Sequence, residues 1–311
     1  MHIIGKTNVD FIKLRFVTYI VTGILILAGV VALIARGGPT YGIDFTGGVL
    51  VQVSYDKPVP MDEIRTALAG YEGLELQSTG LSSIIVRAKG DQKQADQFGA
   101  HVAEVLTQKI AGTKFNVERT EYVGATVGRH LVKQAGFAII FSFIGIIVYV
   151  AFRFRSVIWG SAGVFALMHD VFIVFGMFCV LNKEINLNII AALLTLAGYS
   201  INDTIVVYDR IRENLRLMPK ADLGTVINTS INQTLSRTII TAFTVFLVSL
   251  GLFFFGGEVI HGFALAMVMG VVIGTYSSIF IASPIIYEWE QYKLRKTKER
   301  VAKRSNTAKK K

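Results

Sequence analysis

The sequence predicts a polytopic α-helical membrane protein with six transmembrane helices, plus a small α+β ferredoxin-like extracytoplasmic domain. Of its 311 residues, 52% are hydrophobic and only 17% are charged, whereas about a quarter of the residues of a soluble domain are charged. Apolar stretches of about 20 residues, the length that crosses a bilayer, recur along the chain. A long segment between the first two stretches has strand and helix patterns of its own.

The predicted spans follow from these apolar stretches. They are residues 16–35, 135–152, 157–181, 187–208, 238–256 and 262–287. The first is longer than the apolar core of a signal peptide, so we expect a retained anchor. The chain then divides into a cytoplasmic tail (1–15), the first span (16–35), the extracytoplasmic domain (36–133), a bundle of the other spans (134–287) and a basic cytoplasmic tail (288–311).

The distribution of charge predicts the orientation of the spans. The formal net charge is +10, yet residues 36–133 hold 11 basic and 11 acidic residues. The basic excess lies in both tails, at Arg153 and Arg155, and in the link 210–220, all on one side of a six-span chain. The positive-inside rule makes that side cytoplasmic. We therefore expect a multi-pass protein with both termini in the cytoplasm.

The basic tail allows two interpretations. We favour a topology determinant that is attracted to anionic membrane lipids, at about 1 kcal/mol per basic residue near the surface. A docking site for the ribosome or a partner protein is the alternative. No folded nucleic-acid-binding module or aromatic interleaving accompanies the charge, so we expect no nucleic acid partner.

Residues 41–123 show the order βαββαβ, which is that of the ferredoxin-like motif. Val49, Val51, Val53 and Tyr55 recur at every second position, the period of a strand. The further expected elements are a helix at 61–70, strands at 74–79 and 83–88 around a turn at Gly80–Ser83, a helix capped by Asp91, and a strand at 114–123.

The segment Tyr41–Gly48, with the sequence YGIDFTGG, precedes the first predicted strand. Its paired glycines permit positive φ angles and a close approach of the backbone. A phosphate-binding loop would need a Lys-Ser/Thr pair and a following helix, and the segment lacks both. We therefore interpret Gly42, Asp44, Gly47 and Gly48 as a structural motif that forms a turn.

A carboxylate, Asp203, lies inside the fourth apolar stretch. A charge at that depth costs about 2.5–3.5 kcal/mol on insertion scales, and such residues usually face a bundle interior or a watery cavity. Thr195, Tyr199 and Asn202 share its helix face. Hydrogen bonding between helices would explain Thr195 or Asn202. It would not explain Asp203, because an uncharged Asn at that position would make the same bonds at lower cost. We interpret Asp203 as a functional residue.

Other polar residues lie in the neighbouring spans. Arg237 and Thr241 form part of a stripe on the fifth span, where Arg237 is either a partner of Asp203 or a topology charge. Asp170 follows His169 near the middle of the third span, which indicates either a hydrated path or a buried pair satisfied by adjacent helices. We assign Asp203, Arg237, Asp170, Asn202 and Thr241 to a proton pathway.

Small residues recur every four positions in the sixth span, a spacing that lets helices approach closely. They are Gly262, Ala266, Gly270, Gly274, Ser278 and Ala282. We expect Gly270 and Gly274 to serve helix packing.

Three motifs resemble those of the SecF proteins, the smaller membrane subunits of the bacterial SecD–SecF pair, which belong to the RND superfamily. They are YGIDFTGG at 41–48, AGYSINDTIVVYDRIRENLR at 197–216 and SINQTLSRTIIT at 230–241. The resemblance covers residues 8–290. It implies a subunit of the Sec translocase in the bacterial inner membrane that uses the proton gradient, together with SecD, to promote preprotein translocation.

The resemblance also implies partners and residue roles. The partners would be SecD, the SecYEG channel, YajC, the secreted preprotein chain and membrane lipids, with protons as the coupling ion. Asp203 matches the membrane carboxylate of the family, Arg237 its arginine on the next span, and Asp170 a common His-Asp pair. We expect no enzyme activity, cofactor or metal.

Three other functions remain open. An RND-type exporter of small molecules or lipids would need a larger extracytoplasmic domain and a second half. An intramembrane aspartyl protease would use Asp170 and Asp203 but lacks the GxGD context. A scaffold for the channel complex would tolerate the loss of the Asp203 charge.

Overall fold

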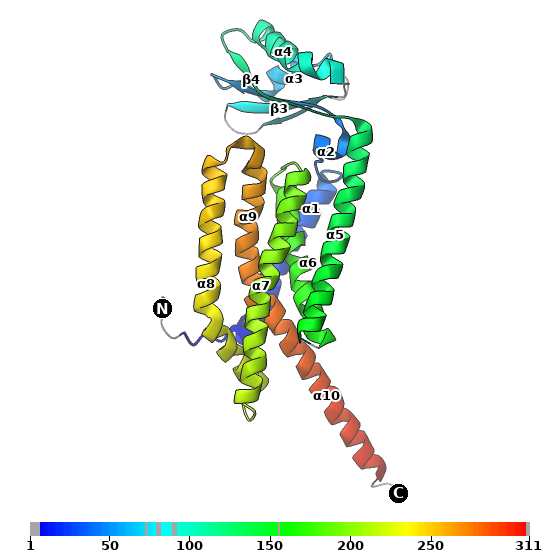
Figure 1. Ribbon diagram of the computed structural model, residues 1–311, viewed down its shortest axis with the longest axis vertical. Coiled ribbons are helices and arrows are strands. Elements are labelled where there is room, and N and C mark those ends of the chain that lie inside the picture. Colours follow the sequence, from blue (N-terminus) through cyan, green and yellow to red (C-terminus); the bar gives the residue numbers. More distant parts are fainter. Residues whose placement is uncertain (1–6, 72–73, 79–81, 89–91, 155, 309–311) are drawn as a thin grey trace. The chain divides into compact units, whose positions relative to one another are not determined.

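The computed structural model describes residues 7–71, 74–78, 82–88, 92–154 and 156–308 (Figure 1). The chain forms two compact units. The helical unit comprises Met1–Thr40, Ile139–Glu184 and Asn188–Lys311, and the sheet unit comprises Tyr41–Ala138 and Ile185–Leu187. Most of the predicted turn at Gly80–Ser83, the predicted cap Asp91 and the basic residue Arg155 lie outside the described residues.

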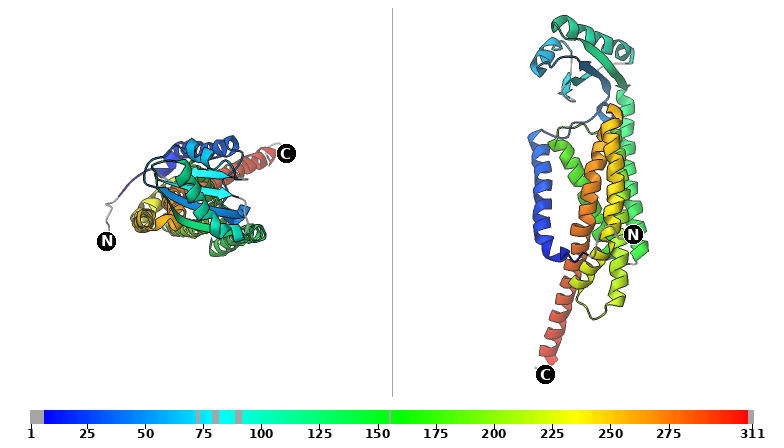
Figure 2. Two further views of the ribbon diagram at one scale, coloured as in Figure 1. Left: turned by 90° about the horizontal axis from the view of Figure 1, so that it is seen from above. Right: turned by 90° about the vertical axis from the view of Figure 1, so that its left-hand side faces the viewer.

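Within the described residues, six helices are long and apolar enough to cross a membrane, which confirms the predicted number of spans. They are α1 (Phe11–Ala35), α5 (Ala125–Phe154), α6 (Val157–Val180), α7 (Leu187–Leu217), α8 (Leu223–Phe255) and the continuous run of α9 (Gly257–Ser277), η1 (Ser278–Ala282) and α10 (Ser283–Ala308). The segment η1 is a π-helical turn inside this last helix. Helices α8 and α9 lie side by side as an antiparallel hairpin (Figure 2).

Several helices extend beyond the apolar stretches that predict the spans. Helix α7 ends at Leu217 and α8 begins at Leu223, so both continue into the basic link between them. Helix α10 runs through the basic tail as far as Ala308. Lys, Arg and Glu are good helix formers. Apolar residues therefore mark the membrane crossing but not the end of the helix.

The start of α8 is defined by its N-cap residue, Asp222. The Asp222 carboxylate accepts hydrogen bonds from the hydroxyl of Thr225 and, at 3.0 Å, from the backbone N–H of the same residue. These bonds favour the charged carboxylate and hold the pKa of Asp222 below its usual range. The cap satisfies one of the free N–H groups at the start of the helix.

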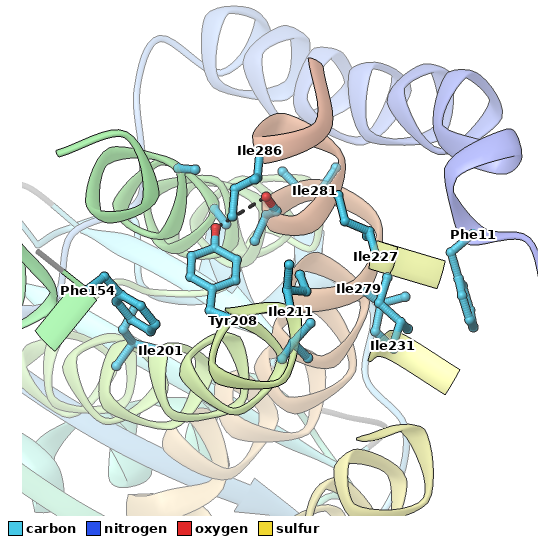
Figure 3. Packing of buried hydrophobic residues seen from close by; sticks show 14 of the residues in the cluster. Phe11, Phe154, Ile201, Tyr208, Ile211, Ile227, Ile231, Ile279, Ile281 and Ile286 are labelled. Atoms are coloured by element: carbon cyan, nitrogen blue, oxygen red, sulfur yellow. Dashed lines mark hydrogen bonds between the residues drawn. The ribbon is translucent and has the colours of Figure 1, made fainter. Parts of the chain in front are cut away.

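A hydrophobic core joins α1, α5, α6, α7, α8, η1 and α10 in the helical unit (Figure 3). Tyr208 of α7 is fully buried there, and the rings of Phe154 and Trp159 lie edge-on to it at 5.5 Å. Its hydroxyl donates a hydrogen bond of 3.2 Å to the carbonyl oxygen of Ala282 in η1. Tyr208 thereby fixes the register of α7 against the π-helical turn.

Glycines allow two pairs of helices to approach closely. A Cβ atom on Gly29 of α1 would lie 2.8 Å from the Cα atom of Gly176 in α6. A Cβ atom on Gly270 of α9 would lie 2.7 Å from a leucine side chain of α7, and one on Gly274 would lie 3.1 Å from the Cβ atom of Ser200. Larger residues at these positions would force the helices apart.

The sheet unit has the predicted order of elements. They are β1 (Gly48–Tyr55), α3 (Met61–Ala67), β2 (Glu75–Ser78), β3 (Ser83–Ala88), α4 (Gln92–Lys109) and β4 (Phe115–Val123). Neighbouring strands are antiparallel, and their order across the sheet is β2-β3-β1-β4. This arrangement confirms the ferredoxin-like fold.

Helices α3 and α4 cover one face of the sheet (Figure 1). Val49, Val51 and Val53 of β1 are buried on this face, as the predicted alternation requires. Leu50 points to the other face and packs with Ile43, which belongs to the short helix α2 (Ile43–Thr46). The segment YGIDFTGG therefore contains one helical turn that is packed against the sheet.

We expect Gly29→Val to destabilise the helical unit, because the new side chain would meet the backbone of Gly176. Overpacking of this kind costs about 1–3 kcal/mol. Gly23→Val is the matched control on the same helix, since nothing lies within 4 Å of a Cβ atom there. Thermal unfolding of the purified protein in detergent measures both effects. An equal fall in Tm for the two variants would contradict this role of Gly29.

Candidate functional site

Asp203 of α7 is buried where three elements of the helical unit meet. Its Oδ1 accepts a hydrogen bond of 2.7 Å from the hydroxyl of Thr238 in α8. Its Oδ2 accepts a hydrogen bond of 2.6 Å from the hydroxyl of Ser278 in η1. Both carboxylate oxygens therefore have hydroxyl donors, and each donor comes from a different helix.

Asp170 of α6 is completely buried and has its own set of donors. Its Oδ2 accepts hydrogen bonds from the hydroxyls of Ser200 in α7, at 2.5 Å, and Ser277 in α9, at 2.7 Å. Its Oδ1 lies 2.8 Å from Nδ1 of His169. The other ring nitrogen, Nε2, lies 3.2 Å from the hydroxyl of Thr22 in α1. A hydrogen-bonded chain thus connects α1 with Asp170.

The two acids are connected through consecutive residues on the last helix and through residues one turn apart on α7. Ser277 donates to Asp170, and the next residue, Ser278, donates to Asp203. On α7, Ser200 donates to Asp170 and lies one helical turn before Asp203. The buried polar residues therefore form one layer that crosses the bundle from α1 to α8, rather than two isolated sites.

Each of the consecutive serines has a second acceptor within reach. The Ser277 hydroxyl lies 3.1 Å from the carbonyl oxygen of Gly274, and the Ser278 hydroxyl lies 3.0 Å from that of Thr275. A hydroxyl has one proton to donate. It can bind a charged carboxylate or, when the acid is protonated and becomes a donor itself, turn to the carbonyl oxygen. Both acids can therefore gain and lose a proton without leaving an unsatisfied buried group.

His169 also connects this layer with a cavity. A groove of about 820 Å³ lies between α1 and α6, and its lining is mostly apolar. Thr22 and His169 are among the residues that line it, together with the close pair Gly29 and Gly176. Asp170 is completely buried and does not line the groove itself. It is hydrogen-bonded to His169, which does.

The other residues assigned to the proton pathway lie on exposed surfaces. Arg237, Thr241 and Asn202 are all exposed in this chain. Among the ion pairs of the described residues, none joins Asp203 to Arg237. The α8 residue that binds Asp203 is Thr238, which follows Arg237 and lies on the adjacent face of the helix.

Sequence analysis did not identify the hydroxyl donors of the two acids. They are Ser200, Thr238, Ser277 and Ser278. Ser200 carried a signal, because it precedes Asp203 by one turn of the same helix. Ser278 belongs to the small-residue pattern that we interpreted as packing. Of that pattern, Gly270 lies against Leu196 of α7 and Gly274 lies against Ser200.

The motif residues Gly42, Asp44, Gly47 and Gly48 lie together in the sheet unit. The N–H of Gly42 donates 2.8 Å to the carbonyl oxygen of Ile185, and Gly47 and Gly48 have φ angles of 72° and 119°. A Cβ atom on Gly48 would lie 2.8 Å from the carbonyl oxygen of Ala88. These two positions therefore require glycine.

Comparison with known families identifies the group to which this architecture belongs. The family model described as "Protein export membrane protein SecD/SecF, C-terminal" matches residues 102–292, more than half of the chain. The chain belongs to the SecD/SecF family. The model described as "SecD/SecF GG Motif" matches residues 32–59. The first match contains Asp170 and Asp203, and the second contains Asp44.

Individual members of the SecD/SecF family are similar over most of the chain. Protein translocase subunit SecF of Endomicrobium trichonymphae is 46% identical over 291 residues, which are 93% of this chain and 94% of the relative. Protein translocase subunit SecF of Pseudomonas aeruginosa is 39% identical over 90% of each chain. These relatives confirm the resemblance to SecF.

A solved structure shows the same fold. The crystal structure of SecDF, a translocon-associated membrane protein from Thermus thermophilus, matches 92% of this chain with a TM-score of 0.81 and 34% identity. The present chain covers 39% of that longer chain.

We expect Thr238→Val to destabilise the helical unit by about 1–3 kcal/mol, the cost of removing one donor from a buried polar group. The substitution keeps the shape of the side chain but leaves Oδ1 of Asp203 without the hydroxyl that binds it. Thr241→Val, the same change one turn along on an exposed surface, is the control. Equilibrium unfolding in mixed micelles measures the free energy of unfolding of both variants. A larger loss of stability for Thr241→Val than for Thr238→Val would contradict the contact between Thr238 and Asp203.

Proposed function

We propose that this chain is the SecF-type subunit of a Sec protein translocase and that, with a SecD-type partner, it uses the proton gradient to promote preprotein translocation across the cytoplasmic membrane. The observation that carries this proposal is the pair of buried acids whose donors Ser277 and Ser278 each have a second acceptor within reach. The names of the relatives support the translocase part, and the longer SecDF chain supports a SecD-type partner.

The geometry supports a mechanism in which protonation changes the packing of the helices. When Asp203 is charged, its two oxygens hold Thr238 of α8 and Ser278 of η1 against α7. When Asp203 takes up a proton, one oxygen becomes a donor, and Ser278 turns to the carbonyl oxygen of Thr275. Hydrogen bonds to a charged carboxylate are stronger than those to a neutral one, so the two protonation states hold α8 and η1 against α7 with different strength, which is the differential interaction that a two-state change requires.

The proton gradient supplies enough energy to drive such a change. One proton that crosses the membrane potential contributes about 2.3 kcal/mol per 100 mV. A bias of this size shifts a two-state equilibrium by more than tenfold. Protons would reach Asp203 from one side and leave on the other as the bundle alternates. Asp170 and His169 would form a second proton-binding site that is connected to Asp203 through the serines.

The finer assignments of place and partner belong to the same proposal. The positive-inside rule supports cytoplasmic termini and an extracytoplasmic sheet unit. The SecYEG channel and YajC are the expected neighbours, and the exposed Arg237 and Asn202 are candidates for contact with the SecD-type partner or with water. A translocase role supports a location in the bacterial cytoplasmic (inner) membrane.

The hydrogen bonding argues against an aspartyl protease. A protease dyad shares one proton between two carboxyls. Among the described residues, Asp170 and Asp203 each bind separate hydroxyls, and no hydrogen bond joins the two carboxyls. We propose no enzyme activity.

We expect Asp203→Asn to abolish gradient-dependent translocation while leaving folding and association with the SecD-type partner intact, because the amide keeps the shape but cannot exchange a proton. Asp209→Asn on the same helix is the matched control, since it removes an exposed ion pair with Arg153 that contributes about 0–1 kcal/mol. Preprotein import into inverted membrane vesicles, with and without a proton gradient, measures the effect. Normal gradient stimulation by Asp203→Asn would favour a scaffold.

A further inference from the structure

The YGIDFTGG segment joins parts of the sheet unit that lie far apart in the sequence. Tyr41 pairs with Ile185 in a parallel bridge, and the N–H of Gly42 donates to the carbonyl oxygen of Ile185. Oδ2 of Asp44 accepts a hydrogen bond of 2.9 Å from the N–H of Leu187. Leu187 is the first residue of α7. The segment therefore holds the start of α7 within the sheet unit.

The same segment packs closely against the start of α5. A Cβ atom on Gly47 would lie 3.0 Å from the Cα atom of Ala125, the first residue of α5. A Cβ atom on Gly128 would lie 3.3 Å from the carbonyl oxygen of Asp44 and from the backbone nitrogen of Gly47. The absence of side chains at Gly47 and Gly128 therefore lets the segment pack directly against the backbone of α5. Asp44 lies in this closely packed segment.

Asp44 is suited to hold a helix start. The first N–H groups of a helix have no partner inside the helix, and the positive end of the helix dipole favours a carboxylate. The contact is remote in sequence, because Asp44 lies 143 residues before Leu187. A carboxylate from another part of the chain therefore binds one of the N–H groups at the start of this helix.

Helix α7 continues from this contact to the acids of the candidate site. It runs from Leu187 in the sheet unit to Leu217 in the helical unit, and it carries Ser200 and Asp203. At about 1.5 Å per residue, Asp203 lies about 24 Å along the helix from Leu187. A displacement of the helix start would move both side chains.

We propose that Asp44 is a positioning residue that couples the sheet unit to α7, so that movement of the sheet unit and protonation of Asp203 are linked. This inference rests on the proposed function. Without the Asp44 carboxylate, α7 still carries Asp203, and protons still bind there, but the sheet unit no longer moves with the helix. The loss is one of coupling between proton movement and translocation, not of proton binding.

The experiment compares Asp44→Ala, Asp44→Asn and Asp56→Ala in the complex with the SecD-type partner, reconstituted in vesicles. Asn keeps an oxygen that accepts from the N–H of Leu187. Asp56→Ala is the matched control, because Oδ1 of Asp56 also accepts a backbone N–H at 2.9 Å in the same unit, but from Lys114 rather than from a residue of α7. Each variant is tested for amide hydrogen exchange at 187–190, proton flux and preprotein translocated per proton.

We expect Asp44→Ala to speed exchange at 187–190 by roughly fivefold, the factor that corresponds to the loss of one helix cap. The preprotein translocated per proton falls by a similar factor, while Asp44→Asn and Asp56→Ala stay near wild type. General destabilisation would lower flux and translocation together and leave their ratio unchanged, which would overturn the proposal. Unchanged exchange in Asp44→Ala would also overturn it.

Asp203→Asn, measured alongside, separates this inference from the proposed function. If Asp203→Asn stops gradient-dependent translocation but Asp44→Ala keeps the wild-type ratio, only the role of Asp44 is wrong. If Asp203→Asn retains translocation and flux, the proposed function fails, and the coupling proposed for Asp44 fails with it.

Discussion

The need to satisfy two buried carboxylates organises the helical unit. A charged group that is removed from water must find hydrogen-bond partners inside the protein. Here the partners are hydroxyls from α7, α8 and the last helix, together with the imidazole of His169 on α6. No cation lies within ion-pair distance of Asp203 among the described residues. An arginine in contact would lock the charged form, whereas hydroxyls can serve the charged and the neutral form because they both donate and accept.

The surrounding packing serves the same requirement. Hydroxyls are short, so helices must come close to bring them to a carboxylate. Gly270 and Gly274 allow α9 to approach α7 at the level of Ser200, and Ser277 and Ser278 follow directly on the same helix. The π-helical turn begins at Ser278, and π-helical turns occur frequently at functional sites. Tyr208 secures the far end of this turn through Ala282. Packing residues and polar residues are therefore parts of one arrangement.

The features that were predicted from the sequence are those that depend on local pattern. Apolar length identified the spans, and the alternation of Val49, Val51 and Val53 identified a strand, because burial on one face imposes that period. The partner of Asp203 on α8 could not be predicted in the same way. Thr238 and Thr241 are both compatible with a polar face, and only the rotation of α8 within the bundle decides between them. The sequence identified Asp44 as part of a structural motif, but its contact with α7 could not be predicted, since its partner Leu187 lies 143 residues away.

Helix α7 is the element on which these features converge. Its sequence contains one glycine, Gly198, and no proline. Sharp kinks arise mostly at proline, at Gly/Ser pairs or at π-bulges, and α7 is assigned as α-helix from Leu187 to Leu217. In a continuous α-helix the first N–H, Ser200, Asp203 and Tyr208 are spaced at a regular rise of about 1.5 Å per residue. A broken helix, in which the two halves could hinge, would allow the acids to change their contacts while the helix start stayed still. The unbroken α7 makes the position of its start and the hydrogen bonding of its acid parts of one equilibrium.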